Sequence, residues 1–482
     1  METTQLVGVA LLIIILRYLY GVVNHPLSGI PGPWHTRWTS AVLKFYLLKG
    51  QGPAYVHFLH HKYGPIVRIS AEDVDVCDPA AARVIHRVKN EFLKSPSFYA
   101  RLVPGVQNIF NTTDLDYHRR HRRLLSSPIS ESNLKSVFMP IISSKVKLTI
   151  DRIAAEAGER GAADVFKWWL FMAADIISEL SFGDSFQMLE SGKKNQYIRD
   201  IEATGPAAGI RLTFPTLYYI ARYVRIPFIQ EAVKTQGRMF RYAEQSILRH
   251  KSLVENQSPG GQQTLFTKLY KAGEEGLSPL EITCDAQAYI IAGSDTAAIT
   301  LTYLVWAVCR HPEVKRKLVQ EVGKLPADFG DDEVRQLSYL HWVIDEALRL
   351  YCAAPAGLPR VVPPGGAHLA GHQLPAGATV RTQAYSLHRE PTVFANPDKF
   401  IPERWENPTK DMRDAFMPFG GGSRVCIGMH LARLELGLAT ALFFKRFPNA
   451  QISALEGMAE ADMVPNMFFL LSPKGKRCLV EV

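Results

Sequence analysis

One segment constrains the fold more than any other, because it predicts a long helix that must run through the inside of the protein. Residues 278–281 (Ser-Pro-Leu-Glu) form a strong helix start: the serine can cap, the proline fits the first helical position and the glutamate completes a capping box. Because Pro312 biases His311 out of helical conformation, the helix can extend to Arg310, about 33 residues or ~50 Å. Much of it is apolar on all sides, so we expect burial in the core of a large domain.

The rest of the chain is mainly helical in pattern, with short strands near its start and in its last third. We expect strands at 64–70, 73–78, 368–374 and 379–386, a loop at 258–261, and helices at 134–157, 165–182, 239–253, 337–351 and from about Cys426 to Lys445. The sequence therefore predicts a mainly α protein with small β-sheets (α+β).

The amino-terminal segment is apolar enough to cross a membrane. Leu6 to Leu16 is an unbroken apolar run, which residues 18–23 continue after Arg17. A span needs roughly 17 to 20 residues, a length that the run reaches if Arg17 snorkels to the interface. A cleaved signal peptide is disfavoured, because no Lys or Arg precedes the run and no small-residue cleavage site follows clearly. We expect an uncleaved anchor over residues 1–25 and a single domain over 26–482.

The distribution of charge indicates where the domain lies. Arg37, Lys44 and Lys49 follow the span and no basic residue precedes it, so the positive-inside rule predicts a cytosolic domain. Glycans on either sequon, at Asn111 or Asn256, would contradict this orientation.

The charge distribution and the cysteine content argue against a nucleic-acid-binding protein and against a disulfide-rich protein. The formal charge of +9 is scattered except for an arginine cluster at 119–123, and no nucleic-acid-binding motif accompanies it, so we expect no nucleic acid partner. Six cysteines without a CxxC pair do not form a disulfide framework.

The strongest chemical feature is a glycine-rich loop with one cysteine, residues 419–428 (FGGGSRVCIG). Cys426 stands at the start of the last predicted helix, where the helix dipole and orphan N–H groups favour the thiolate, and Arg424 adds positive charge. Gly428 lets a flat ligand approach the backbone. A thiolate in such a site suits coordination of iron, although a free buried cysteine is the alternative.

This decapeptide resembles the haem-binding signature of cytochromes P-450, Phe-x-x-Gly-x-Arg-x-Cys-x-Gly, at every fixed position. The resemblance implies haem b (iron protoporphyrin IX) with Cys426 as the axial ligand and with Phe419, Arg424 and Gly428 as cofactor-binding residues. It also implies a monooxygenase that inserts one oxygen atom from O₂ into a hydrophobic small molecule. Electrons would come from NADPH through a membrane-bound reductase, with cytochrome b5 as an optional second donor.

Two further motifs of the family are present. Glu346 and Arg349, at i and i+3, resemble its Glu-x-x-Arg pair, and Arg404 in Pro-Glu-Arg-Trp is a third member; this trio would brace the haem loop. Residues 292–296 (AGSDT), in the middle of the long helix, resemble the oxygen-activation motif. The resemblance makes Thr296 a residue that assists oxygen activation and Asp295 its proton source. The polar pair beside a glycine also suggests a local opening that water could enter, whereas a satisfied helix kink is the alternative.

Four basic residues are candidates for binding the haem propionates. His118 and Arg122 resemble the family's Trp-x-x-x-Arg, with histidine in place of tryptophan, which puts that contact in doubt. Arg360 and Arg424 resemble further propionate ligands, in keeping with the pairing of arginines and carboxylates.

The substrate and the partners are less constrained. The expected apolar substrate wall comprises Phe110, Phe214, Ile291, Ala292, Ala356, Leu358 and Phe468, and the expected reductase-docking face comprises Arg120, Arg123 and Lys135.

His57, His60 and His61 are expected on a surface helix rather than at a metal. The chain resembles fungal microsomal members of secondary metabolism at residues 64–70 (GPIVRIS), 122–126 (RRLLS) and 402–405 (PERW). This resemblance implies an endoplasmic reticulum membrane and a polyketide, terpenoid or alkaloid intermediate. A haem-thiolate isomerase or dehydratase, a peroxide-using enzyme and a non-catalytic haem-binding protein remain alternatives.

Overall fold

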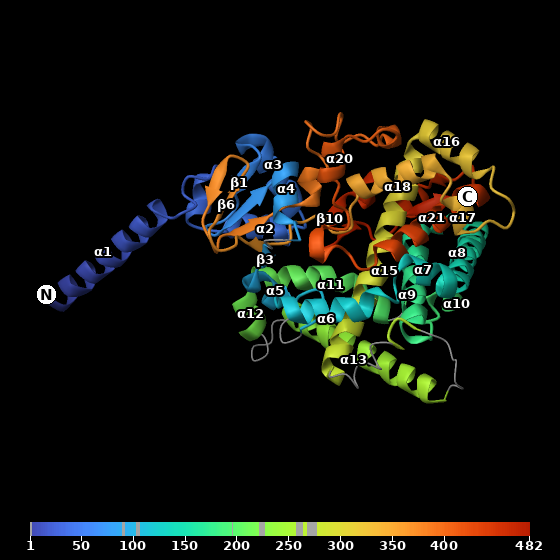
Figure 1. Ribbon diagram of the computed structural model, residues 1–482, viewed down its shortest axis with the longest axis horizontal. Coiled ribbons are helices and arrows are strands. Elements are labelled where there is room, and N and C mark those ends of the chain that lie inside the picture. The colour runs from blue at the N-terminus through green and yellow to red at the C-terminus, as the bar shows by residue number, and fades with distance from the viewer. Residues whose placement is uncertain are drawn as a thin grey trace.

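The computed structural model describes residues 2–88, 92–102, 107–194, 196–220, 227–256, 264–267 and 277–482 of the 482-residue chain. Helices form most of the body, and a small β-rich region lies on the side from which α1 projects (Figure 1). The α-helices are α1 (Glu2–Val23), α2 (Ala41–Leu48), α3 (Gly52–Tyr63), α4 (Pro79–Ile85), α5 (Pro96–Leu102), α6 (Leu115–Ser126), α7 (Glu131–Asn133), α8 (Met139–Arg160), α9 (Val165–Phe182), α10 (Met188–Ser191), α11 (Gln196–Thr213), α12 (Pro215–Ile220), α13 (Pro227–Asn256), α15 (Pro279–Arg310), α16 (Pro312–Val322), α17 (Asp331–Val334), α18 (Ser338–Leu350), α19 (Ala384–Leu387), α20 (Lys410–Ala415) and α21 (Met429–Arg446).

The strands of the described residues form small sheets, which confirms the predicted mainly α fold. One sheet has the order β1-β2-β8-β5-β3, a second has the order β4-β12-β9, and β6-β7 and β10-β11 are two-stranded. The strands are β1 (Ile66–Arg68), β2 (Asp73–Val76), β3 (Leu93–Lys94), β4 (Ala163–Asp164), β5 (Arg360–Val361), β6 (Ala367–Leu369), β7 (His372–Leu374), β8 (Thr379–Arg381), β9 (Gln451–Ile452), β10 (Pro465–Met467), β11 (Leu471–Pro473) and β12 (Leu479–Glu481). The pair predicted over 64–78 is β1 and β2.

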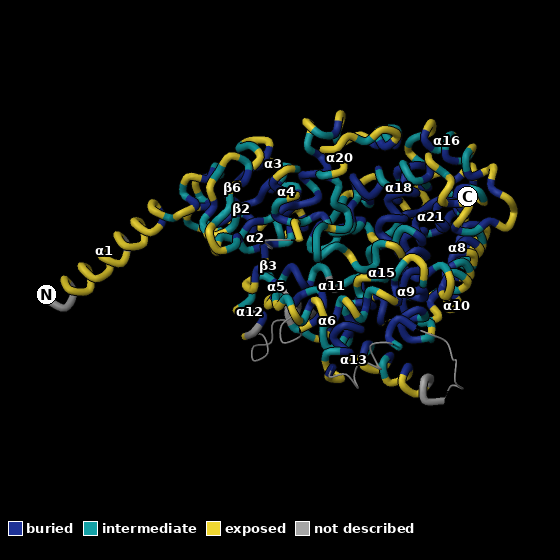
Figure 2. The backbone as a smooth tube through the Cα atoms, viewed as in Figure 1, coloured by how far each residue is buried: buried dark blue, intermediate teal, exposed yellow. Residues whose placement is uncertain are grey.

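Helix α15 is the long, buried helix that the sequence predicts. The Ser278 hydroxyl accepts the Glu281 N–H at 3.2 Å, and the Glu281 carboxylate accepts the Ser278 N–H at 2.8 Å, which completes the capping box. The helix ends at Arg310 and lies against α9, and most of it is buried in the main core (Figure 2). At Gly293 a Cβ atom would stand 2.5 Å from Cγ1 of Ile177 in α9. Glycine here allows close helix packing, and the helix stays continuous instead of opening at the motif.

Four predicted elements have different bounds. The strand expected over 368–374 is the hairpin β6-β7, because Ala370 and Gly371 turn the chain with φ of 46° and 80°. The strand expected over 379–386 ends with β8, since its register with β2 stops at Arg381, and α19 follows. A π-helical turn at Leu134–Phe138 precedes α8, and α13 is longer than the 239–253 segment. The loop expected at 258–261 lies outside the described residues.

Helix α1 stands apart from the body of the protein and is exposed along most of its length (Figures 1 and 2). An 18-residue window of Gln5–Val23 has a mean hydropathy of 2.4, and Val22 is the only buried residue among those whose exposure the structure describes there. Helix α15 is also long and apolar enough to span a membrane, but it is 67% buried and belongs to the core.

Candidate active site

The cysteine loop closes tightly against the end of α4. Gly420 and Gly422 adopt left-handed φ values of 71° and 63°, which side chains other than glycine rarely tolerate. A Cβ atom on Gly422 would lie 1.8 Å from the carbonyl oxygen of His86. The Cys426 N–H donates to the Phe419 carbonyl at 2.9 Å and closes the loop. The backbone conformation therefore requires glycine at positions 420 and 422, and close packing also requires it at 422.

The Cys426 thiol is exposed although it lies inside the protein. Burial raises the pKa of this thiol, while the Gly428 N–H and the Arg122 guanidinium act in the opposite direction. From a thiol that is accessible yet desolvated, we infer that Cys426 faces an internal cleft. The last helix was predicted from about Cys426; α21 begins at Met429 with Gly428 as its N-cap, so Cys426 lies two residues before the cap and meets the helix terminus through the Gly428 N–H.

The middle of α15 forms another wall of this cleft. Ala292 is exposed although Ile290 and Ser294, two residues away on either side, are buried. The phenol of Tyr289, one turn earlier, is fully buried and lies close enough to Cys426 for the thiolate charge to help raise its pKa, after burial itself. Helix α15 and the cysteine loop therefore face each other across the cleft.

The acid–alcohol pair of α15 has two distinct environments. Burial raises the pKa of Asp295 to about 7, with a smaller contribution from the charge of Glu202 in α11, and Lys476 opposes the rise. The Thr296 hydroxyl donates to the Ala292 carbonyl at 2.8 Å, and its oxygen keeps acceptor capacity. Asp295 can therefore hold or release a proton near neutral pH, as a general acid requires.

The predicted propionate residues come together around His118. Burial, and then the charges of Arg424, Arg122, Lys94 and Arg360, lower the pKa of His118 to about 3. This histidine is thus a neutral group within a ring of cations. Arg122 donates to the Val425 carbonyl at 2.8 Å, next to Cys426, and Arg424 donates to the Thr112 carbonyl at 3.3 Å.

Lys94 is a member of this ring that the sequence did not reveal. Its ammonium donates to the Phe110 carbonyl and lies 4.5 Å from the ring centroids of both Tyr99 and Phe110. Burial is the main cause that lowers the pKa of Lys94, and Arg424 and Arg360 add to it. The lysine stands in β3, away from any motif, so no sequence pattern could have marked it.

These residues fit a haem group. The cleft offers an accessible thiol on one wall and a ring of cations suited to carboxylates. The buried Tyr99 hydroxyl has no hydrogen-bond partner among the described residues, although a buried polar group normally has one. A Cβ on Gly428 would meet the Cys426 sulfur at 3.9 Å and no nearer described atom, so a planar group can approach there.

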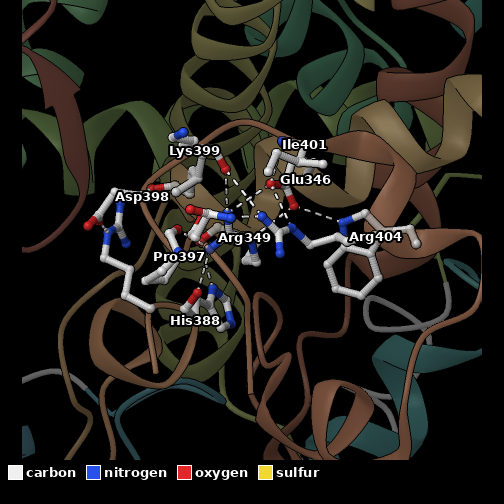
Figure 3. Close-up of polar contacts among 12 residues, drawn as sticks. Glu346, Arg349, His388, Pro397, Asp398, Lys399, Ile401 and Arg404 are labelled. Atoms are coloured by element: carbon white, nitrogen blue, oxygen red, sulfur yellow. Dashed lines mark hydrogen bonds and ion pairs between the residues drawn. The ribbon is translucent and has the colours of Figure 1, made fainter. Parts of the chain in front are cut away.

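A buried carboxylate organises the support of the loop (Figure 3). Glu346 accepts five hydrogen bonds, two from Arg349 and one each from Arg404, Trp405 and the Ile401 N–H. Arg349 also donates to the carbonyls of three residues of the following segment, namely His388, Pro397 and Lys399. The predicted trio is present, and Trp405 joins it through its indole N–H at 3.0 Å.

His388 connects this support to the cysteine loop, which the sequence did not predict. Its Nδ1 atom hydrogen-bonds to the Arg349 carbonyl at 2.9 Å, and its Nε2 atom accepts the Met417 N–H at 2.8 Å. Burial, despite the bond to the Arg349 carbonyl, lowers the pKa of His388 to about 3. The ring is therefore neutral, with its proton on Nδ1.

Other candidates lie in mixed positions. Phe110 and Phe468 are half-buried, whereas Phe214 is 40% exposed. His57 and His61 lie on α3 with their Nε2 atoms 3.1 Å apart. The expectation of a surface position was wrong for His60, which is buried and bonded to Asp75 at 2.9 Å, because α3 packs against β1 and β2.

Comparison with known proteins identifies the family of this chain. The family described as Cytochrome P450 matches residues 31–479. Cytochrome P450 monooxygenase tazI of Aspergillus terreus is 50% identical over 485 residues, which cover 100% of this chain and 99% of the relative. Cytochrome P450 monooxygenase aflV of Aspergillus parasiticus is 37% identical, with 97% and 94% covered. Averantin hydroxylase of Dothistroma septosporum is 31% identical, with 92% and 84% covered. This chain therefore belongs to the cytochrome P450 family and is a haem-dependent monooxygenase.

Proposed function

We propose that this enzyme inserts one oxygen atom from O₂ into a hydrophobic intermediate of fungal secondary metabolism, with electrons from NADPH through a reductase. The accessible, desolvated Cys426 thiol opposite α15 carries this proposal. The similarity to an averantin hydroxylase favours hydroxylation among the possible oxidations. The haem, when bound, would supply the oxygen chemistry, and the protein supplies binding, orientation and protons.

Each residue has a separate role in this proposal. Cys426 binds the iron, and the Gly428 N–H and Arg122 moderate the basicity of its sulfur. His118, Arg122, Arg360 and Arg424 hold the propionates, and the half-buried Phe419 and Gly428 flank the porphyrin. Asp295 holds a proton on its carboxyl group near pH 7 and passes it through water to the Thr296 side of the cleft.

Partners and location form a second part of the proposal. The exposed α1 serves as a single-pass anchor in the endoplasmic reticulum membrane, with the domain in the cytosol. A reductase docks on the face that includes Arg120, Arg123 and Lys135. Arg120 lies 3.1 Å from Glu281 and Lys135 lies 3.0 Å from Asp332, so an acidic partner must compete with these surface carboxylates. Such exposed pairs are weak, which makes the exchange feasible.

Deletion of the gene followed by metabolite profiling should reveal the substrate as an accumulating compound. That compound is then incubated with the full-length protein, NADPH, the reductase and isotopically labelled O₂. We expect one labelled oxygen atom in the product, and we expect Thr296→Ala to consume NADPH while releasing more hydrogen peroxide. Product formation without O₂ or NADPH would instead support an isomerase, a dehydratase or a peroxide-using enzyme.

A further inference from the structure

A buried histidine–carboxylate pair joins α6 to α15 outside the motifs described above. His121 and Asp285 both have fully buried side chains, and the His121 Nδ1 atom is hydrogen-bonded to Oδ2 of Asp285. The other carboxylate oxygen of Asp285 accepts the Ile109 N–H at 2.8 Å. Asp285 therefore connects two elements to a loop, and an ionised carboxylate, which only accepts hydrogen bonds, fixes the imidazole proton on Nδ1.

The loop in question, residues 107–112, is held by α6 at a second point. The Tyr117 ring stacks on the His121 imidazole, with centroids 3.8 Å apart and an interplanar angle of 12°. The Tyr117 hydroxyl donates to the Gln107 carbonyl at 3.1 Å. One face of α6 thus orients the histidine and also binds the start of the loop.

The 107–112 loop is cross-linked by its own hydrogen bonds. The Asn108 side-chain oxygen accepts the N–H groups of Phe110 at 3.0 Å and Asn111 at 2.9 Å, and the Asn111 side-chain oxygen accepts the Asn108 N–H at 2.8 Å. Because these bonds fix the loop as a unit, an anchor at Ile109 sets the position of the neighbouring Phe110.

The far end of this loop reaches the cleft. Arg424 of the cysteine loop donates to the Thr112 carbonyl at 3.3 Å, and Lys94 donates to the Phe110 carbonyl. The Phe110 ring lies edge-on to Phe469, with centroids 6.1 Å apart. The loop therefore carries an aromatic side chain between the cationic ring and the apolar segment after β10.

We propose that the His121–Asp285 pair is a positioning device that holds the 107–112 loop against α15 and thereby sets the size of the substrate cavity at Phe110. Both side chains are fully buried by the protein, so His121 and Asp285 act as positioning residues. Without the histidine donor, Asp285 would be a buried carboxylate with one partner fewer, which favours a rearrangement that admits water and breaks the bond to the Ile109 N–H. This inference rests on the proposed haem cavity, but its first test does not.

The first test measures hydrogen exchange of the peptide that covers 107–112 in the haem-loaded, full-length protein. We expect His121→Leu to speed exchange there about tenfold or more, because a hydrogen bond to a buried charge is lost. His121→Asn keeps a donor near the Nδ1 position and should restore most of the protection. His60→Leu breaks another buried histidine–aspartate pair, His60–Asp75, and serves as the matched control without effect on this peptide.

The second test compares two haem ligands of different size by optical titration. Imidazole needs little of the cavity, whereas clotrimazole, an imidazole with a trityl group, must fit against its walls. We expect His121→Leu to weaken clotrimazole binding about tenfold and to leave imidazole binding within about twofold. The reduced carbon monoxide spectrum confirms that each variant holds its haem.

Three results would overturn the proposal. They are unchanged exchange at 107–112 in His121→Leu, equal exchange in His121→Asn and His121→Leu, and equal weakening of both ligands. If exchange changed as expected but neither ligand bound at the haem in wild type, the loop anchor would stand and the proposed haem cavity would fail.

Discussion

The Nε2 atom of His388 accepts the Met417 N–H at 2.8 Å, which places a neutral imidazole between the glutamate–arginine support and the cysteine loop. We expect His388→Leu to lower the free energy of unfolding by about 1–3 kcal/mol, because the part-buried Met417 N–H loses its acceptor. The same change should speed haem loss. His388→Gln offers an acceptor near the Nε2 position and should behave more like wild type. Equal haem-loss rates in wild type and His388→Leu would contradict this role.

Trp405 adds a fifth hydrogen bond to Glu346, at 3.0 Å. Trp405→Phe keeps an aromatic ring but leaves that carboxylate oxygen with one donor fewer. We expect a loss of about 1–2 kcal/mol of stability, measured by denaturant unfolding of the haem-loaded protein. The matched control is Trp34→Phe, since Trp34 is 78% exposed. An equal loss of unfolding free energy in both variants would show that the hydrogen bond from Trp405 to Glu346 does not stabilise the protein.

Gly293 allows α15 to approach Ile177 of α9. We expect Gly293→Ala to destabilise the protein by about 1–3 kcal/mol, because the added methyl group would stand 2.5 Å from Cγ1 of Ile177. Adding Ile177→Ala removes that atom, so the double variant should lose less than the sum of the single variants. Additive losses, measured by thermal unfolding, would exclude this contact as the cause.

Cys426 is the expected iron ligand. We expect Cys426→Ala to abolish the thiolate-type carbon monoxide difference spectrum of the reduced protein, because no other cysteine takes part in the loop. Cys284→Ala, in α15, is the control that should retain the spectrum. An unchanged spectrum in Cys426→Ala would refute the assignment.

Asp295 should make stability depend on pH in a defined window. Its pKa is raised from 3.8 to about 7, so the folded state binds the proton more tightly than the unfolded state. Stability from this group is full below 3.8 and is lost as the pH rises through about 7. Relative to wild type, Asp295→Asn should therefore gain up to a few kcal/mol between these pH values. A pH-independent difference in unfolding free energy would contradict the raised pKa.

The elements with local signals were predictable from the sequence. The capping residues at 278–281 and the proline at 312 define α15 because they act on the helix ends themselves. The cysteine loop and the Glu346–Arg349 pair were recognisable for the same reason: each motif lies within a few residues of chain.

Features that depend on distant segments were not predictable. His388 and Lys94 acquire their partners through contacts with Met417 and Phe110, and neither has a local pattern. The segment after Arg381 has strand-like residues but folds as α19, because its neighbour β2 offers no further register. Gly293 was read as an opening for water, whereas its packing partner comes from α9.

The close approach of α9 at Gly293 also limits how this enzyme can diversify. Because a side chain of α9 packs directly on the α15 backbone at Gly293, α15 cannot shift without a change in α9, and this wall of the cleft is fixed. The 107–112 loop is held by individual hydrogen bonds, such as the one that the Ile109 N–H donates to Asp285. One substitution can therefore change the position of this loop. In this chain, substitutions at the anchors of the 107–112 loop are therefore expected to change which substrates fit, while the position of α15 stays the same.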